Sequence, residues 1–193
     1  MIDGTLAGLL QAARFTVQDP RAGARALLAM RLPMQVRWLA FGLVVTGSSL
    51  LTVIAVRLSP SGDDPAVAEV LSQPVGLALM QGVVMLVFAQ LMARVGQLAG
   101  GRGGFSDALL LLTWVQIILI LLQIAQVAIE LVLPPAADAL GLLGLGLMMW
   151  LVTHFTTELH GFTSPRTVFL GVICTLLAAG FVVSLLLVAI VGV

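Results

Sequence analysis

Five long stretches without a charged residue constrain the fold of this chain more than any other feature of its sequence. They are Trp38–Val56, Val70–Ala93, Ala108–Ile129, Ala139–Thr157 and Thr167–Val193. Because a helix rises 1.5 Å per residue, each stretch is long enough to cross a hydrocarbon core of about 30 Å. The alternation of polar and apolar residues that a membrane-spanning strand needs is absent. The pattern therefore predicts an all-α integral membrane protein with five transmembrane helices.

Composition supports a membrane location. Only 9% of the 193 residues are charged and 60% are hydrophobic, whereas a soluble domain carries roughly 25% charged residues. Turn-forming segments separate the apolar stretches: SPSGDDP at 59–65, GGRGG at 100–104, two prolines at 134–135 and GFTSP at 161–165. The expected spans are approximately residues 36–57, 74–98, 106–133, 138–158 and 166–191. No other segment is long enough for a soluble domain, so residues 1–193 are expected to form one membrane domain.

Residues 1–33 precede the first span and are predicted to form two short amphipathic helices. Apolar side chains recur at helical spacing through the first of them, at Ile2, Leu6, Leu9, Leu10, Ala13 and Val17. Asp19 and Pro20 end this helix and start the next, because aspartate caps helices and proline favours the first turn. The segment lies either in the headgroup plane or against the protein's own loops. The side chains expected at the membrane surface are Arg14, Arg21, Arg25 and Arg31.

The distribution of arginine predicts the orientation in the membrane. The chain contains no lysine, and eight of its nine arginines fall on one side when the loops alternate: Arg14, Arg21, Arg25, Arg31, Arg37, Arg94, Arg102 and Arg166. The other loops are mainly acidic, with Asp63, Asp64, Glu69, Glu130 and Asp138 beside Arg57. Cytoplasmic loops carry an excess of basic residues. We therefore expect a cytoplasmic N-terminus and a C-terminus on the outer side.

A row of polar residues runs along the third span. Gln116, Gln123 and Glu130 are seven residues apart and Gln126 lies three beyond Gln123, so the row occupies one helical face. Gln81 of the second span is expected to meet the far end of this row, and Gln90 or Gln97 its start. Amides are unfavourable in lipid, so the row should face other helices. Two interpretations remain open: hydrogen bonding between helices, or a polar path for an ion or a lipid headgroup.

A second group of polar residues is expected at the cytoplasmic side, where the sequence carries Arg94, Arg102, His154, Glu158, His160 and Arg166. His154 and Glu158 are four apart and share a helical face, which suits an ion pair or hydrogen bond near the interface. The same spacing can place two ligands on a metal. No third ligand, HExxH or CxxC accompanies them, so no metal and no other cofactor is predicted.

The sequence contains no recognisable catalytic constellation. A GxSxG motif and paired intramembrane aspartates are absent, and the GGRGG segment lacks the lysine of a phosphate-binding loop. Small residues instead predict close helix packing in the fourth and fifth spans, at Gly141, Gly144, Gly146, Gly171, Thr175, Ala178, Ala179 and Gly180. An enzyme is therefore not expected.

Two segments, GGRGGFSDAL at 100–109 and ELHGFTSPRT at 158–167, together with Asp19-Pro20-Arg21 and the five spans, resemble the Yip family of membrane proteins in its bacterial branch. The resemblance covers nearly the whole chain. It implies five helices, the bacterial inner (cytoplasmic) membrane and, in the eukaryotic branch, roles in vesicle traffic with small-GTPase partners. Bacteria lack that machinery and the N-terminal segment here is short, so only the fold and the membrane location carry over.

Two functions follow from these observations. The first is a non-enzymatic membrane protein that organises partner proteins or lipid. The second is a small transporter, channel or lipid-translocating protein in which the polar row of the third span lines a path. The candidate partners are membrane lipid, a second copy of the chain and another membrane protein; nucleic acid is not expected.

Overall fold

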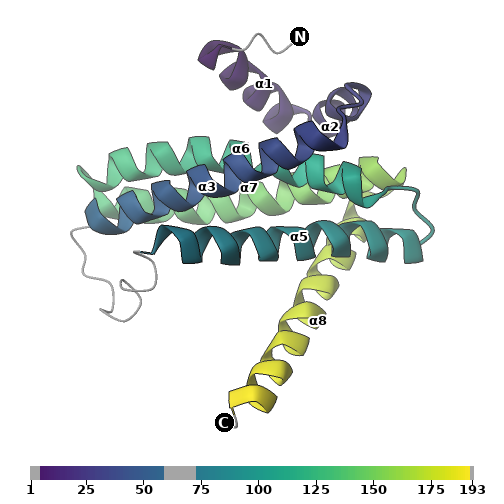
Figure 1. The fold of residues 1–193 in the computed structure, drawn as a ribbon. Helices are drawn as coiled ribbons and strands as arrows, with labels where there is room; N and C mark the ends of the chain where they lie inside the picture. The colour runs from purple at the N-terminus through teal and green to yellow at the C-terminus, as the bar shows by residue number, and fades with distance from the viewer. Residues whose placement is uncertain (1–4, 59–72, 192–193) are drawn as a thin grey trace.

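A computed structural model describes residues 5–58 and 73–191 of the chain. Ile2 and the acidic side chains Asp63, Asp64 and Glu69, on which part of the sequence argument rests, lie outside these residues. The described part is helical and contains no β-strand. Two short helices are followed by five long ones (Figure 1). This confirms the predicted all-α fold class.

The two short helices are α1 (Leu6–Gln18) and α2 (Pro20–Ala29). The hydroxyl of Thr5 caps α1 by accepting from the N–H of Gly8 at 3.1 Å. Asp19 caps α2 by accepting from the N–H of Ala22 at 2.9 Å, and Pro20 occupies its first turn. The predicted break at Asp19-Pro20 is therefore correct: Asp19 acts as the N-cap of α2 and Pro20 stands in the first turn, the positions that these residue types favour.

The five long helices are α3 (Met34–Leu58), α5 (Pro74–Leu98), α6 (Phe105–Glu130), α7 (Pro134–His160) and α8 (Pro165–Val191). All five are long and apolar enough to cross a membrane. A proline begins α5, α7 and α8, where its missing N–H would have had no helical partner. Gly161 ends α7 in the left-handed conformation with φ of 71°, which favours glycine.

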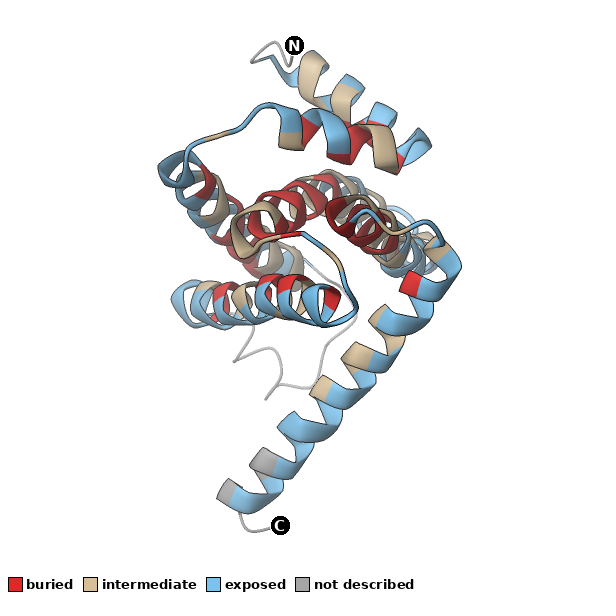
Figure 2. Cartoon of the chain, turned by 90° about the vertical axis from the view of Figure 1, so that its right-hand side faces the viewer, coloured by how far each residue is buried: buried red, intermediate tan, exposed pale blue. Residues whose placement is uncertain are grey.

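Four of the long helices, α3, α5, α6 and α7, lie side by side in a bundle (Figure 1). Helix α6 is central because it contacts α3, α5 and α7, and α2 packs across α6 and α7 from one side. Helix α8 packs against α7 and then leaves the bundle at a steep angle (Figures 1 and 2). We call the end of the bundle formed by α1–α2, the α5–α6 loop and the α7–α8 loop the arginine-rich end.

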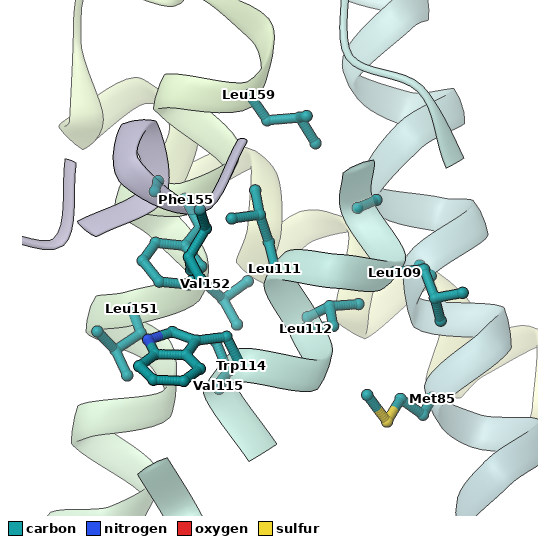
Figure 3. Close-up of a cluster of buried hydrophobic side chains, with 14 of the residues drawn as sticks. Met85, Leu109, Leu111, Leu112, Trp114, Val115, Leu151, Val152, Phe155 and Leu159 are labelled. Carbon is teal, nitrogen blue, oxygen red and sulfur yellow. The ribbon is translucent and has the colours of Figure 1, made fainter. Parts of the chain in front are cut away.

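The hydrophobic core lies in the half of the bundle near the arginine-rich end. Helices α5, α6 and α7 supply most of it, and Figure 3 shows Met85, Leu109, Leu111, Leu112, Trp114, Val115, Leu151, Val152, Phe155 and Leu159. Ala24 and Leu27 of α2 complete it. The amphipathic N-terminal segment is therefore part of the core and not an independent arm.

The predicted close packing of small residues holds for Gly141 and Gly144 of α7 but fails for Gly146 of the same helix and for the glycines of α8. A methyl group added at Gly141 or Gly144 would meet Gln126 or Leu122 of α6 at 3.2 and 3.0 Å. A methyl group at Gly146, Gly171 or Gly180 would meet nothing within 4 Å. The expectation for α8 was wrong because its small residues face open space, so they do not bring another described helix close.

Candidate functional site

The imidazole of His160 lies at the centre of the arginine-rich end. The ring is almost fully buried, with 4% of the residue exposed. Its Nδ1 accepts from the N–H of Gly103 at 3.1 Å, and its Nε2 lies 2.9 Å from the carbonyl oxygen of Met92. Because the N–H of Gly103 can only donate, Nδ1 must be bare and Nε2 must carry the proton that Met92 accepts. The two bonds therefore fix one neutral tautomer, and the ring joins α7 to α5 and to the α5–α6 loop.

Three glycines leave the space that this ring occupies. A Cβ at Gly96, Gly101 or Gly103 would overlap the imidazole or the neighbouring Leu159. The side-chain amide of Gln97 closes the loop by donating to the carbonyl of Gly103 at 2.8 Å. Of Gln90 and Gln97, which were expected near the start of the third span, Gln97 therefore lies there. The glycine-rich segment is therefore a receptacle for His160.

Glu158 holds α2 against α7. Its Oε2 accepts from Nε of Arg21 at 3.2 Å and from Nη1 of Arg25 at 3.1 Å. The two arginines are four residues apart, so they share one face of α2. Arg21 also donates to the carbonyl of Phe162 at 3.4 Å. We call this group of Arg21, Arg25 and Glu158 the clamp.

Two further contacts fix the N-terminal segment. Nε1 of Trp114 donates to the hydroxyl of Thr16 at 3.1 Å, and both residues are buried. Gly23 allows α2 to cross α1 closely, because a Cβ there would come within 2.8 Å of that same hydroxyl. Near the start of α3, Nη1 of buried Arg37 lies 2.6 Å from Oδ1 of Asp107 in the first turn of α6. Asp107 also suits the positive end of the α6 dipole.

The match to known proteins covers this whole arrangement. Residues 16–187 match the Yip1 domain, from within α1 to within α8. The chain belongs to the Yip1 domain family. Neither a curated protein nor a solved structure matches the sequence. In this Yip1-domain protein the two segments that suggested the family, GGRGGFSDAL and ELHGFTSPRT, meet at His160.

The predicted polar row of α6 meets hydroxyl groups of α3. The amides of Gln81 and Gln116 donate to the hydroxyl of Ser48 at 2.9 and 3.2 Å. The hydroxyl of Ser49 lies 3.2 Å from the amide oxygen of Gln81. One turn further along, Gln123 donates to the hydroxyl of Thr52 at 3.1 Å. These bonds join α3, α5 and α6 near mid-span.

The remaining members of the row lie beyond this hydrogen-bonded cluster. Gln126 packs beside Gly141 of α7, and Glu130 is the last residue of α6. Gln81 was expected at the far end of the row, but it meets Gln116 through Ser48, near mid-span. The sequence did not predict the partners of Gln81, because a single serine in a span does not indicate a hydrogen bond to another helix. The spacing of Ser48, Ser49 and Thr52 on one helix could have indicated a polar face.

The predicted cytoplasmic cluster divides into two groups. Glu158 and His160 take part in the clamp and the glycine receptacle. His154 contacts the carbonyl of Trp150 at 2.8 Å, and its ring lies tilted at 47° against the Trp150 ring. The expected contact between His154 and Glu158 is not formed, because α2 supplies two guanidinium groups to that carboxylate. Arg94, Arg102 and Arg166 are exposed, and no hydrogen bond or ion pair of theirs is found within residues 5–58 and 73–191.

The four arginines expected at the membrane surface also divide. Arg21 and Arg25 bind Glu158 of the same chain. These two arginines therefore follow the alternative in which the N-terminal segment docks on the protein itself. Arg14 and Arg31 are exposed, and Arg31 forms the turn before α3 with φ of 46°. No group of three or more metal-ligating side chains occurs in the part of the chain that the structure describes.

Proposed function

We propose that this Yip1-domain protein is a non-enzymatic organiser that presents its arginine-rich end to anionic lipid or to a partner protein. One observation carries the proposal: Arg14, Arg94, Arg102 and Arg166 are exposed and make no ion pair with a described residue, beside a segment that is rigidly clamped. Arginines held near an anionic membrane surface attract it by about 1 kcal/mol each. A fixed set of such side chains suits recognition of acidic groups.

The orientation is part of this proposal. The arginine-rich end is proposed to face the cytoplasm of a bacterial inner membrane, because basic loops are retained on that side. Cysteine labelling in a Cys174→Ala background tests it, with Gly104→Cys as the reporter because a Cβ there meets nothing within 4 Å. Ser61→Cys, outside the described residues, reports on the opposite side. Labelling of Ser61→Cys from the cytoplasm would refute the orientation.

The transporter alternative has less support. The amides that would line its path are engaged with hydroxyl groups of α3, as expected of contacts that hold helices together. Transport sites near the bilayer centre typically use discontinuous helices, whereas α3, α5 and α6 run unbroken past this cluster.

The two functions are separated by reconstituting the full chain into liposomes that contain anionic lipid. Replacing Arg94, Arg102 and Arg166 with glutamine should lower co-purifying anionic lipid by roughly fivefold per arginine. If the ligand is a protein, the same variant should lose cross-linking of that partner at the arginine-rich end. Arg57→Gln, at the opposite end of the bundle, is the control and should change neither. Ion or lipid flux that disappears when Gln123 and Glu130 are made apolar would overturn the organiser and support the transporter.

A further inference from the structure

A groove lies between α5, α7 and α8, on the side of the bundle where α8 diverges. Its volume is about 430 Å³. The α5 wall extends from Phe88 to Ala99 and the α8 wall from Ser164 to Leu176. At 1.5 Å per residue the α5 wall, which belongs to the bundle, is about 17 Å long, and one leaflet contributes about 15 Å of hydrocarbon. The groove therefore begins at the arginine-rich end and reaches about one leaflet deep.

The chemistry of the groove changes along its length. Thr163, Ser164 and Thr167 place hydroxyl groups at the end nearest the α7–α8 loop. Beyond them the walls are mainly apolar, with Leu91, Val95, Phe88, Val172 and Leu176. A polar rim above an apolar channel matches the order of groups in a phospholipid, in which a headgroup and glycerol esters precede the acyl chain.

A positively charged group lies next to the rim. Phe162 lines the groove, and its carbonyl accepts from Nη2 of Arg21 at 3.4 Å. The clamp contains two guanidinium groups and one carboxylate, so it has a net charge of +1. Of the two arginines, Arg21 keeps 37% of its side chain exposed. An anionic headgroup at the rim would therefore meet a complementary charge.

We infer that this groove binds one phospholipid of the adjoining leaflet, with an acyl chain along α5 and α8 and an anionic headgroup at Thr163, Ser164 and Arg21. This site adds a specific phospholipid to the proposed function. It rests on that proposal only in assuming that the protein acts on lipid. It does not use the exposed side chains of Arg94, Arg102 and Arg166. Each proposal can therefore fail without the other.

A matched pair of substitutions tests the site. Gly171 lines the groove and Gly180 lies outside it on the same helix, and a Cβ at either position meets nothing within 4 Å. The backbone at both positions therefore accepts a side chain; Gly171→Phe places a ring in the groove, and Gly180→Phe adds the same ring elsewhere. The full chain is placed in nanodiscs of phosphatidylglycerol carrying a photoactivatable group on its acyl chain, and the cross-linked residues are mapped by mass spectrometry.

The wild-type chain and Gly180→Phe should cross-link within residues 88–99 and 164–176, and Gly171→Phe should lose this labelling to the level of other lipid-facing helices. Phosphatidylcholine carrying the same probe should label the groove roughly fivefold less, because its headgroup carries no net charge. Thr175→Phe fills the groove one turn further along and replaces Gly171→Phe if that variant melts at a lower temperature than the wild type.

Three results would overturn the inference. Labelling spread evenly over all lipid-facing helices would show only the surrounding bilayer. Unchanged labelling in both filled variants would place the lipid elsewhere. Chain-to-chain cross-links from a photoreactive amino acid placed at position 172 would assign the groove to a second copy of the protein. Retained groove labelling in the variant that lacks Arg94, Arg102 and Arg166 would show that the site is independent of those arginines.

Discussion

Helices α6 and α8 are almost equally apolar, yet they occupy opposite environments. Their most hydrophobic windows have mean hydropathies of 2.4 and 2.5, but 50% of the α6 window is buried in the protein and only 6% of the α8 window. Figure 2 shows the same contrast, with buried residues concentrated in the bundle and α8 mostly exposed beyond the part that packs on α7. Since lipid is as apolar as a protein core, apolarity alone does not bring membrane helices together.

The difference between the two helices lies in shape and in polar contacts. The buried half of α6 shares a core cluster with small residues of α5, such as Ala89 and Ala93, and donates a hydrogen bond from Trp114 to α1. Helix α8 makes its main interhelical contacts with α7, and the hydroxyl of Thr175 bonds to the carbonyl of Gly171 within the same helix. Close approach and shared hydrogen bonds therefore distinguish the core from the lipid-facing surface.

The largest expected effect compares one phenylalanine in each environment. Phe155 is fully buried in the core and Phe181 on α8 is 65% exposed. Phe155→Ala should lower the free energy of unfolding by about 3 kcal/mol, at the low end of the range for soluble cores because transfer from lipid adds little. Phe181→Ala should change it by about 0.5 kcal/mol or less. Denaturant unfolding in detergent measures both; equal losses would contradict the comparison.

The second prediction tests the receptacle of His160. Gly96→Ala should lower the free energy of unfolding by about 2 kcal/mol, because its Cβ overlaps the imidazole and forces it from its two hydrogen bonds. Gly47→Ala is the matched control in α3, where a Cβ meets nothing within 4 Å. It should be neutral or stabilise by up to about 1 kcal/mol, as alanine favours helix over glycine. Similar behaviour of the two variants would show that His160 adapts freely.

The sequence predicts the spans and the caps well because those depend on local chemistry. Charge-free stretches long enough to cross a bilayer give α3, α5, α6, α7 and α8, and Asp19-Pro20 gives the boundary between the short helices. The divergence of α8 could not be predicted, because a lipid-facing and a helix-facing surface have the same composition. The small residues of α8 suggested packing, but small size permits a close approach without causing one.

The sequence predicted which residues belong to the candidate site, but it did not predict which of them contact each other. Glu158 and His160 were both singled out, yet the partners of Glu158 lie 137 and 133 residues away on α2. No local spacing reports such a contact, so the nearby His154 was favoured. The role of the glycines was also hidden, because a glycine-rich loop has the same sequence pattern whether it encloses a side chain or only turns the chain.

The third prediction tests how the clamp attaches α2 to the packed half. Glu158→Gln should cost about 1 kcal/mol, between the values for exposed and buried ion pairs, because the carboxylate is 17% exposed and serves two arginines. Amides of residues 20–29 should then exchange hydrogen faster, while the core of α6 stays protected. Asp138→Asn removes a carboxylate from the other end of α7 and is the control. Unchanged exchange in α2 would show that Thr16 and Trp114 suffice.

The smallest expected effect concerns Gln123, which lies where the packed half of α6 gives way to the open half. Its amide donates one hydrogen bond to Thr52, and Gln123→Leu removes that bond while nearly preserving volume. Intramembrane hydrogen bonds contribute about 0.6 kcal/mol on average, because the unfolded state in a membrane also finds partners. The same small loss should follow Thr52→Val, and the double variant should lose no more than either single one. A clear gain in stability on Gln123→Leu would instead indicate that the polar row is kept for transport.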